Sequence, residues 1–440
     1  MADQTRIDLR KMISGPFKAC PKCGQHEYGV WGIYGKRVLR RCRACSHRDF
    51  VTLPPIRKKI IYLDQFVISE FAKLKNPNAR GHKAIAANPF WQEFYDLLVE
   101  LRELQLICCP DSWSHQQESR ISGMNADLKQ MYEQFSGGIT FKNFPDIEAQ
   151  QVYELAHAWA EQREPAFDYS PRNVLSADPN EWNNRFFITF GDSPFVDDSA
   201  IQSSRQAVHQ AVAEIFREKW AVEKQSFEYW YEQERADHQM VAGKKAQQAA
   251  ADRNEAVAAM VSGAPHSLDL LEKILLSPEE NLFQGIAMIL SRTADGGIRS
   301  REDANELMRK FIFATKINDA PYNKLEALMW AVIAMRAGGG QKDPPNEGMA
   351  TDIKTVSRLL PYCDAMFVDN ECRSLLSNIP GKLKPGLAER VYSMQTKEQF
   401  LAYLRSLKQN LSEEHIAGLK EAYGDEVLAN VPPRDPPQGA

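Results

Sequence analysis

Two aspartates stand directly after short apolar runs, a position from which a carboxylate can bind a ligand. Asp64 follows the run Ile60–Leu63, and Asp369 follows the run Ala365–Val368. The first run is too apolar to alternate, which is typical of a parallel strand that is buried on both faces. Ligands of open α/β sheets bind at the carboxyl ends of such strands. Asp64 could equally cap the helix that begins near Phe66, and the sequence alone leaves both roles open.

Four cysteines have the spacing of a metal site. Cys20 and Cys23 form one CxxC pair, Cys42 and Cys45 form a second, and eighteen residues separate the pairs. This spacing predicts a structural zinc ion held by four thiolates. The residues between the pairs are typical of short hairpin strands. We therefore expect residues 1–57 to form a zinc ribbon and a basic linker.

The predicted ribbon is strongly basic. Residues 1–60 contain fourteen Lys and Arg against four Asp and Glu, although the whole chain has a formal net charge of −4. Aromatic residues alternate with these cations, a mixture that suits phosphate contacts and base stacking. The alternative is a solvated basic surface whose aromatic residues fill a small core around the metal. The candidate nucleic-acid-binding residues are Lys36, Arg37, Arg40, Arg41 and Arg43.

The remaining elements predict an α/β core that is interrupted by helices. A second buried strand, Leu104–Cys109, precedes a helix that carries Glu118, and a later helix carries Asp352 in its first turn. The intervening sequence is almost wholly helical in character. The expected divisions are a first half of the core at 58–145, a helical insertion at 146–320, a second half of the core at 321–430 and a disordered tail at 431–440.

This succession of motifs resembles the PIN-domain nucleases over roughly 190 of the 440 residues. The resemblance implies a PIN-like parallel sheet flanked by helices, with acidic residues that hold Mg²⁺ or Mn²⁺ and cleave RNA or, less often, structured DNA. The segments that carry it are Ile60–Asp64 with its helix, the SxxHxxE segment ending at Glu118, the helix with Asp352, CDAMFVD ending at Asp369, and VYSMQTKEQFLAYL. Matched by position, the catalytic and metal-binding acids are Asp64, Glu118, Asp352 and Asp369.

Several neighbouring residues compete with these acids or could assist them. Glu371 and His115 are the accessory candidates. His115 could donate a proton or contact phosphate, although a lone histidine on a helix is more often structural. The competing acids are Glu70, Asp111 and Asp364.

Carboxylates suit the implied chemistry. Phosphodiester hydrolysis needs a nucleophilic water and neutralised charge on the phosphate, and divalent ions supply both. Mg²⁺ prefers oxygen ligands and keeps several waters, so a few carboxylates are enough. Four carboxylates gathered without a metal would raise one another's pKa, so their convergence would imply a cation.

The sequence also argues against several classes of protein. No run approaches the roughly 18–20 apolar residues of a membrane span, and the start of the chain lacks the apolar region of a signal peptide. No P-loop of the form GxxxxGK[ST] occurs. Eight cysteines in 440 residues do not indicate a disulfide scaffold. We expect a soluble cytoplasmic protein that has no membrane partner.

The favoured hypothesis is a metal-dependent endoribonuclease, with RNA preferred to DNA. The resemblance further implies a toxin or a defence effector against phage. The helical insertion is expected to cap the site, gate substrate, or bind a second copy or a regulatory protein. The alternative is a nucleic-acid-binding or scaffold protein that uses the zinc ribbon and does not cleave.

Overall fold

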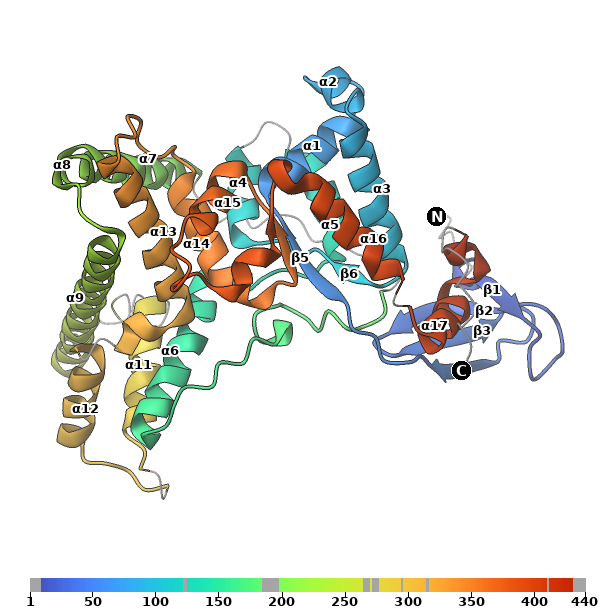
Figure 1. The fold of residues 1–440 in the computed structure, drawn as a ribbon. Coiled ribbons are helices and arrows are strands. Elements are labelled where there is room, and N and C mark those ends of the chain that lie inside the picture. The colour runs from blue at the N-terminus through green and yellow to red at the C-terminus, as the bar shows by residue number, and fades with distance from the viewer. Residues whose placement is uncertain are drawn as a thin grey trace, which may run out of the picture.

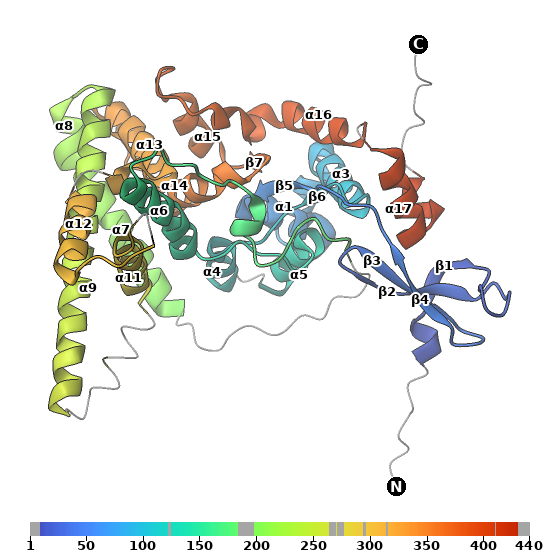
Figure 2. The same cartoon turned by 90° about the horizontal axis from the view of Figure 1, so that it is seen from below.

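The computed structural model describes residues 9–121, 125–183, 198–263, 270, 277–293, 296–313, 316–409 and 411–429. These residues form an antiparallel sheet at one end, a parallel α/β part in the middle and long helices at the other end (Figure 1). Figure 2 shows the same succession from below. The expected mixed α/β class is therefore confirmed, with a parallel sheet and a separate antiparallel sheet at the N-terminal side.

The antiparallel sheet is built from the segment that carries the cysteine pairs. Neighbouring strands pair in chain order. A two-residue turn at Gly35 and Lys36 joins the second strand to the third, and Gly35 has a φ of +60° that favours glycine. The strands are β1 (Ser14–Lys18), β2 (Tyr28–Tyr34), β3 (Arg37–Cys42) and β4 (Arg48–Thr52).

The parallel sheet has the strand order β6-β5-β7-β8. The chain leaves the strand β5 for β6 on one side and later returns to β7 on the other side. Such a reversal of direction opens a crevice at the carboxyl ends of the strands. The strands are β5 (Lys59–Leu63), β6 (Ile107–Cys108), β7 (Ala365–Phe367) and β8 (Val391–Tyr392).

Helices cover both faces of this sheet. Ile61 and Leu63 pack into one core with α1, α3, α5 and α16, while Ile60 and Tyr62 pack into another with α13, α14 and α15. All four side chains are at most 3% exposed, so the prediction of a strand buried on both faces is confirmed. These helices are α1 (Gln65–Lys75), α3 (Pro89–Glu103), α5 (Asn125–Ser136), α13 (Pro321–Gly338), α14 (Met349–Leu359), α15 (Asn370–Ser377) and α16 (Lys397–Lys408).

The sequence of residues 200–260 is compatible with one long helix or a helical hairpin, and the structure divides this part of the insertion near Lys224. The first helical stretch, from Asp198 to Glu223, ends at Lys224, which has a φ of +44°. The next helix begins at Phe227. The insertion helices are α6 (Phe144–Glu161), α7 (Asp198–Ile215), α8 (Ala221–Glu223), α9 (Phe227–Ser262), α11 (Pro278–Leu290) and α12 (Arg301–Phe313). The sequence also predicts a helix at 268–276, which lies outside the described residues except for Leu270, and the expected tail at 431–440 lies wholly outside them.

Short elements join the main ones. Two are short α-helices, α2 (His82–Ala86) and α4 (Trp113–Ile121). The π-helical turn is η3 (Phe216–Trp220). The 3-10 turns are η1 (Leu9–Met12), η2 (Pro171–Asn173), η4 (Lys316–Asp319), η5 (Leu360–Tyr362), η6 (Gly386–Arg390), η7 (Met394–Thr396) and η8 (Asp425–Leu428).

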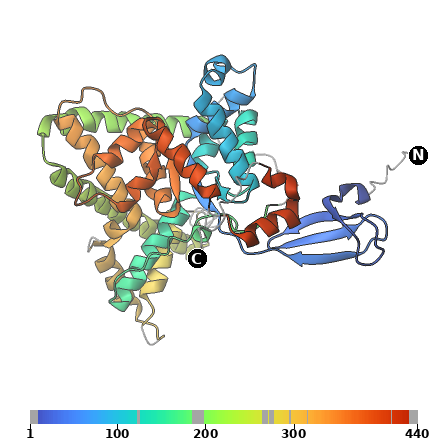
Figure 3. The same cartoon turned by 45° about the vertical axis from the view of Figure 1, so that its right-hand side comes forward.

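The helix α17 (Glu413–Tyr423) packs on the antiparallel sheet, although it follows the α/β segment in the chain. Leu419 and Ala422 share a core with Val30 and Val38 of the sheet and with Trp182. Figure 3 shows this helix lying over the strands. Across the described residues, no helix combines the length and apolarity required to cross a membrane.

Candidate acidic site and zinc centre

The four predicted cysteines converge at one end of the antiparallel sheet. Their sulfur atoms all lie within 4.8 Å of one another. The Sγ atoms of Cys20 and Cys45 are 3.6 Å apart, and those of Cys23 and Cys42 are 3.7 Å apart. Four sulfur ligands around one point match the donor set of structural zinc sites. The cysteine tetrad could therefore hold a metal such as zinc.

The two cysteine pairs have the same backbone turn. Each turn closes with a hydrogen bond to the carbonyl of the first cysteine, donated by Gly24 in the first turn and by Ser46 in the second. Both donors have positive φ, +73° at Gly24 and +59° at Ser46. Glycine adopts this conformation readily, whereas serine is unusual there. The repeated turn directs both cysteines of each pair to the metal position.

Two of the five predicted nucleic-acid-binding cations are used inside the protein. The side chain of Arg40 is 1% exposed and donates to Glu421 of α17 and to the carbonyls of Pro16 and Tyr28. Arg43 lies over the ring of Phe17. The prediction that Arg40 contacts nucleic acid is therefore wrong, because its guanidinium joins the sheet to α17. Arg43 is engaged as well, since it donates to the carbonyl of Ile13.

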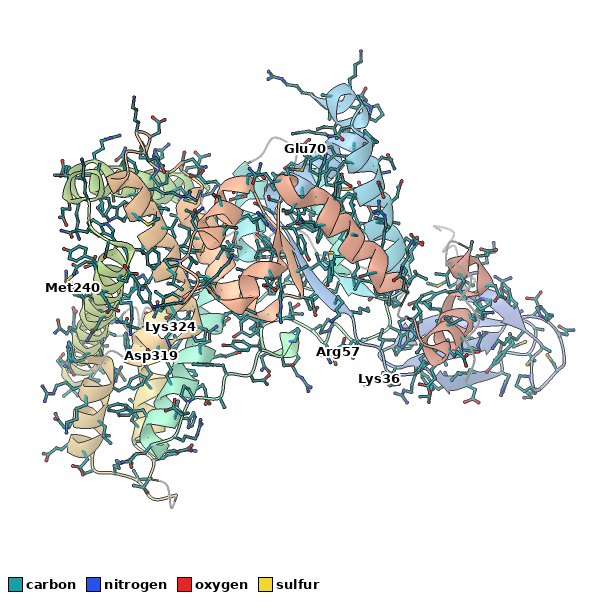
Figure 4. The ribbon with its side chains drawn as sticks, viewed as in Figure 1. Lys36, Arg57, Glu70, Met240, Asp319 and Lys324 are labelled. Atoms are coloured by element: carbon teal, nitrogen blue, oxygen red, sulfur yellow. The ribbon has the colours of Figure 1, made fainter. Side chains whose placement is uncertain are left out.

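The other three predicted cations lie on the outer side of the sheet. The guanidinium of Arg37 lies 4.8 Å from the ring centre of Phe50, and that of Arg41 lies 4.9 Å from the ring centre of Trp31. Phe50 is 47% exposed. Lys36 is exposed at the β2–β3 turn and is labelled in Figure 4. We call the surface formed by Trp31, Tyr34, Lys36, Arg37, Arg41 and Phe50 the ribbon face.

Strand pairing brings the two strand-end aspartates together. The parallel strands β5 and β7 are neighbours, with Leu63 opposite Phe367. The backbone N–H of Asp64 continues this ladder and donates to the carbonyl of Phe367. Asp64 and Asp369 therefore stand at the same edge of the sheet, each after one of the two apolar runs.

The two aspartates differ in whether they cap the helix that follows. Asp64 begins α1 but its side chain makes no capping hydrogen bond. Asp369 begins α15, and its Oδ1 atom accepts a hydrogen bond from the backbone N–H of Cys372 at 2.6 Å. The capping role that the sequence left open for Asp64 is thus not used, so its carboxylate is available to bind a ligand.

The other two acids reach this edge from helices. Glu118 lies on α4, which follows β6, and Asp352 lies in the first turn of α14. The Nη2 atom of Arg205, on the insertion helix α7, lies 2.5 Å from the Oε1 atom of Glu118. Each of these two side chains is 22% exposed. An insertion helix therefore supplies a cation to the acidic group.

Two of the four acids, Asp64 and Asp352, have a raised pKa to which the charges of the other acids contribute. Burial raises the pKa of Asp64 to about 7; the nearby His115 opposes this rise, and the charges of Glu118 and Asp369 add to it. Burial also raises the pKa of Asp352 well above its ordinary value, and the other three carboxylates raise it further. Charges interact this way only over short distances, and most strongly where water is excluded. We call these four residues the acidic site.

The oxygens of the acidic site are more widely spread than the four sulfurs. Among the described residues, the cysteine tetrad is the one group of three or more potential ligands whose atoms all lie within 4.8 Å of one another. Mg²⁺ is commonly held by one or two carboxylates and several waters, so it does not require a tighter cluster. The donor set, four carboxylates on the rim of one sheet, fits a hard divalent cation.

His115 is buried next to the acidic site. Its ring stacks between those of Tyr62 and Tyr132, at centroid distances of 4.9 and 4.7 Å. It is 1% exposed, and neither ring nitrogen has a hydrogen-bond partner, although Nδ1 lies 3.4 Å from Oδ1 of Asp111. This packing fixes the helix that carries Glu118.

The competing acids have other contacts. Glu70 pairs with Lys73 one turn along α1. Asp364 precedes β7, at the opposite edge of the sheet, and pairs with Lys59. Glu371 is nearer the acidic site, since the charge of Asp369 acts on it. Burial raises the pKa of Glu371, and the charge of Asp369 raises it further. Glu371 therefore remains an accessory candidate.

The raised pKa of Asp64 predicts how stability depends on pH. Folding favours the protonated carboxyl, so its contribution to stability is fully present below the unfolded pKa and is lost as the pH rises through about 7. In the absence of metal, we expect a lower melting temperature at pH 8 than at pH 5.5. Asp64→Asn should reduce this difference, and Mn²⁺ at pH 8 should raise the melting temperature. An equal pH dependence in the two proteins, measured by calorimetry, would contradict the assignment.

Sequence reasoning missed two residues that shape these sites. Arg205 and Glu421 each pair with a residue that lies far away in the chain, Glu118 and Arg40 respectively. Neither stands in a motif, so the sequence offered no local signal for them. A comparison of the chain with protein-family models, curated proteins and solved structures finds no match.

Proposed function

We propose that the acidic site binds Mg²⁺ or Mn²⁺ and hydrolyses phosphodiester bonds in RNA, as in the PIN-like nucleases that the sequence resembles. The observation that carries the proposal is the placement of four carboxylates at one edge of the parallel sheet, where the charges of neighbouring acids help to raise the pKa of Asp64 and of Asp352. Such a group destabilises the ionised protein, because each charge opposes the others. Binding of a cation would relieve this repulsion among the carboxylates.

Each acid has a role that its surroundings support. A divalent cation held by these carboxylates would neutralise charge on the phosphate and lower the pKa of a bound water. Asp64 and Asp352 would supply negative charge to the cation, since burial and the neighbouring acids disfavour their ionised forms when no cation is bound. Asp369 keeps Oδ2 for a ligand while its other oxygen holds the start of α15. Such hydrogen bonds fix the direction of a metal ligand.

The test is a cleavage assay on the whole protein. Purified protein would be incubated with single-stranded RNA, double-stranded RNA, single-stranded DNA and duplex DNA, with Mg²⁺, Mn²⁺ or EDTA. RNA cleavage that needs the metal and stops with EDTA would support the proposal. Metal-independent cleavage, or none with any substrate, would contradict it.

A second candidate function is nucleic-acid binding without cleavage, and the ribbon face favours it. Two arginines lie over aromatic rings there, and Tyr34 is 50% exposed beside Phe50. Single strands bind to surfaces of this kind, where bases stack on aromatic rings and cations contact phosphates. This role is compatible with a nuclease, because the ribbon face could hold the RNA that the acidic site cleaves.

Replacing Arg37 and Arg41 together with glutamine should weaken RNA binding. Each phosphate contact contributes roughly 0.7 to the slope of log K against log salt for a single strand, so the slope should fall by about 1.4. Fluorescence anisotropy at several salt concentrations measures both quantities. Lys22→Gln removes a charge from the exposed cysteine turn and serves as the control. An unchanged slope in the double variant would show that the ribbon face does not bind RNA.

A further inference from the structure

The ion pair between Arg205 and Glu118 joins the helical insertion to the acidic site. The two helices α7 and α4 pack together, and the two side chains meet at 2.5 Å. Most residues of α7 that the structure describes are exposed on its outer side, whereas Arg205 is partly buried. The insertion therefore places Arg205 beside an acid from another part of the chain.

The guanidinium acts on more than its direct partner. The charge of Arg205 also lowers the pKa of Asp352, which lies on α14 and is a separate member of the acidic site. Its direct contact within the acidic site is with Glu118. Without metal, the positive charge of Arg205 partly offsets the repulsion among the acids.

A bound divalent cation would change the balance of charge around Arg205. The carboxylates would then be neutralised by the metal, and the guanidinium would be repelled by it. A free guanidinium next to bound metal is suited to an anionic substrate, because its planar donors pair with two oxygens of a phosphate at once. RNA that brings a phosphate to the acidic site must bring it close to α7.

We propose that Arg205 binds the phosphate of the RNA that enters the acidic site, so that the helical insertion supplies a substrate-binding residue. The inference rests on the proposed function, since it takes the acidic site to bind both metal and RNA. The competing explanation is that Arg205 only holds Glu118 in position. These two roles differ in their effect on metal binding, and an experiment can separate them.

The experiment measures RNA binding and metal binding separately. The affinity for a fluorescent single-stranded RNA is measured by anisotropy with Ca²⁺ in place of Mg²⁺, and a gel verifies that the RNA stays intact. Mn²⁺ affinity is measured by electron paramagnetic resonance without RNA. The variants are Arg205→Gln and Arg205→Lys, with Arg217→Gln as the control. Arg217 is an exposed arginine that follows α7 and lies outside both sites.

Arg205→Gln should weaken RNA binding by about ten- to a hundredfold, which is the usual range for one charge-assisted contact. Its Mn²⁺ affinity should be unchanged or higher, because a competing cation has been removed. Arg205→Lys should lie between glutamine and wild type, and Arg217→Gln should match wild type. Melting temperatures identify any variant that fails to fold.

Two results would overturn the inference. Unchanged RNA affinity in Arg205→Gln would show that the guanidinium does not reach the substrate. A fall in Mn²⁺ affinity that parallels the fall in RNA affinity would show that Arg205 merely positions Glu118. Failure of the proposed function looks different, because wild type itself would then bind no Mn²⁺ at the acidic site.

Discussion

Asp64→Asn should abolish metal-dependent RNA cleavage and, at the same time, make the metal-free protein more stable at pH 8. Asparagine has nearly the same shape but removes one buried charge from the acidic site. Replacing residues that only support a metal ligand costs roughly 10- to 100-fold in activity, so loss of a ligand charge should cost at least about a hundredfold. Stability should rise because burial and neighbouring acids disfavour the ionised form of Asp64, whose pKa is raised to about 7.

This combination of effects separates a catalytic defect from misfolding. A misfolded variant would lose activity and stability together. Asp96→Asn is a matched control, since Asp96 is an exposed aspartate on α3 and should tolerate the same replacement without effect. Asp369→Asn should also lose cleavage, while asparagine preserves the helix cap that Asp369 provides. Full cleavage by Asp64→Asn would remove Asp64 from the active site.

The elements that could be predicted from sequence are those that carry their signal locally. The apolar run before Asp64 has no polar position, so it could only be a strand buried on both faces, and its packing confirms this. The spacing of Cys20, Cys23, Cys42 and Cys45 was sufficient to predict the tetrad because the turn within each pair is local. The grouping of the acids is a different case, since strand order decides it and the order is set by long-range packing.

The residues that sequence reasoning misjudged depend on distant partners. Strand β3 has Val38 and Cys42 facing inward, and its two-residue period therefore places Arg40 inward as well. A buried arginine at such a position is unfavourable without a partner, and that partner, Glu421, lies 381 residues away. The same holds for Arg205 and Glu118, which are 87 residues apart. A charge pattern alone cannot separate a solvated arginine from one that joins two parts of a fold.

Cys42→Ser should remove the bound metal and unfold the tetrad end of the antiparallel sheet while the parallel α/β part stays folded. The core next to the tetrad is very small, with Cys20, Tyr28 and Cys42 as its buried members. So small a core cannot hold the two cysteine turns without the metal, because structural zinc contributes on the order of 10 kcal/mol to domains of this type. The other end of the sheet keeps the core that Val30 and Val38 share with α17. Metal analysis should show one zinc per chain in wild type and none in the variant. Limited proteolysis should then cut within residues 14–52 and leave the α/β part intact.

The effect of this variant on RNA cleavage would show how the two sites work together. If the ribbon face delivers RNA to the acidic site, Cys42→Ser should raise KM strongly and change kcat little, because the residues of the acidic site lie on separate elements. Cys108→Ala is the control, since Cys108 is a buried thiol of the parallel sheet and takes no part in the tetrad. An equal loss of kcat would mean that the sheet supports the acidic site directly, through α17 and the neighbouring α16. Unchanged zinc content in Cys42→Ser would instead exclude Cys42 as a ligand.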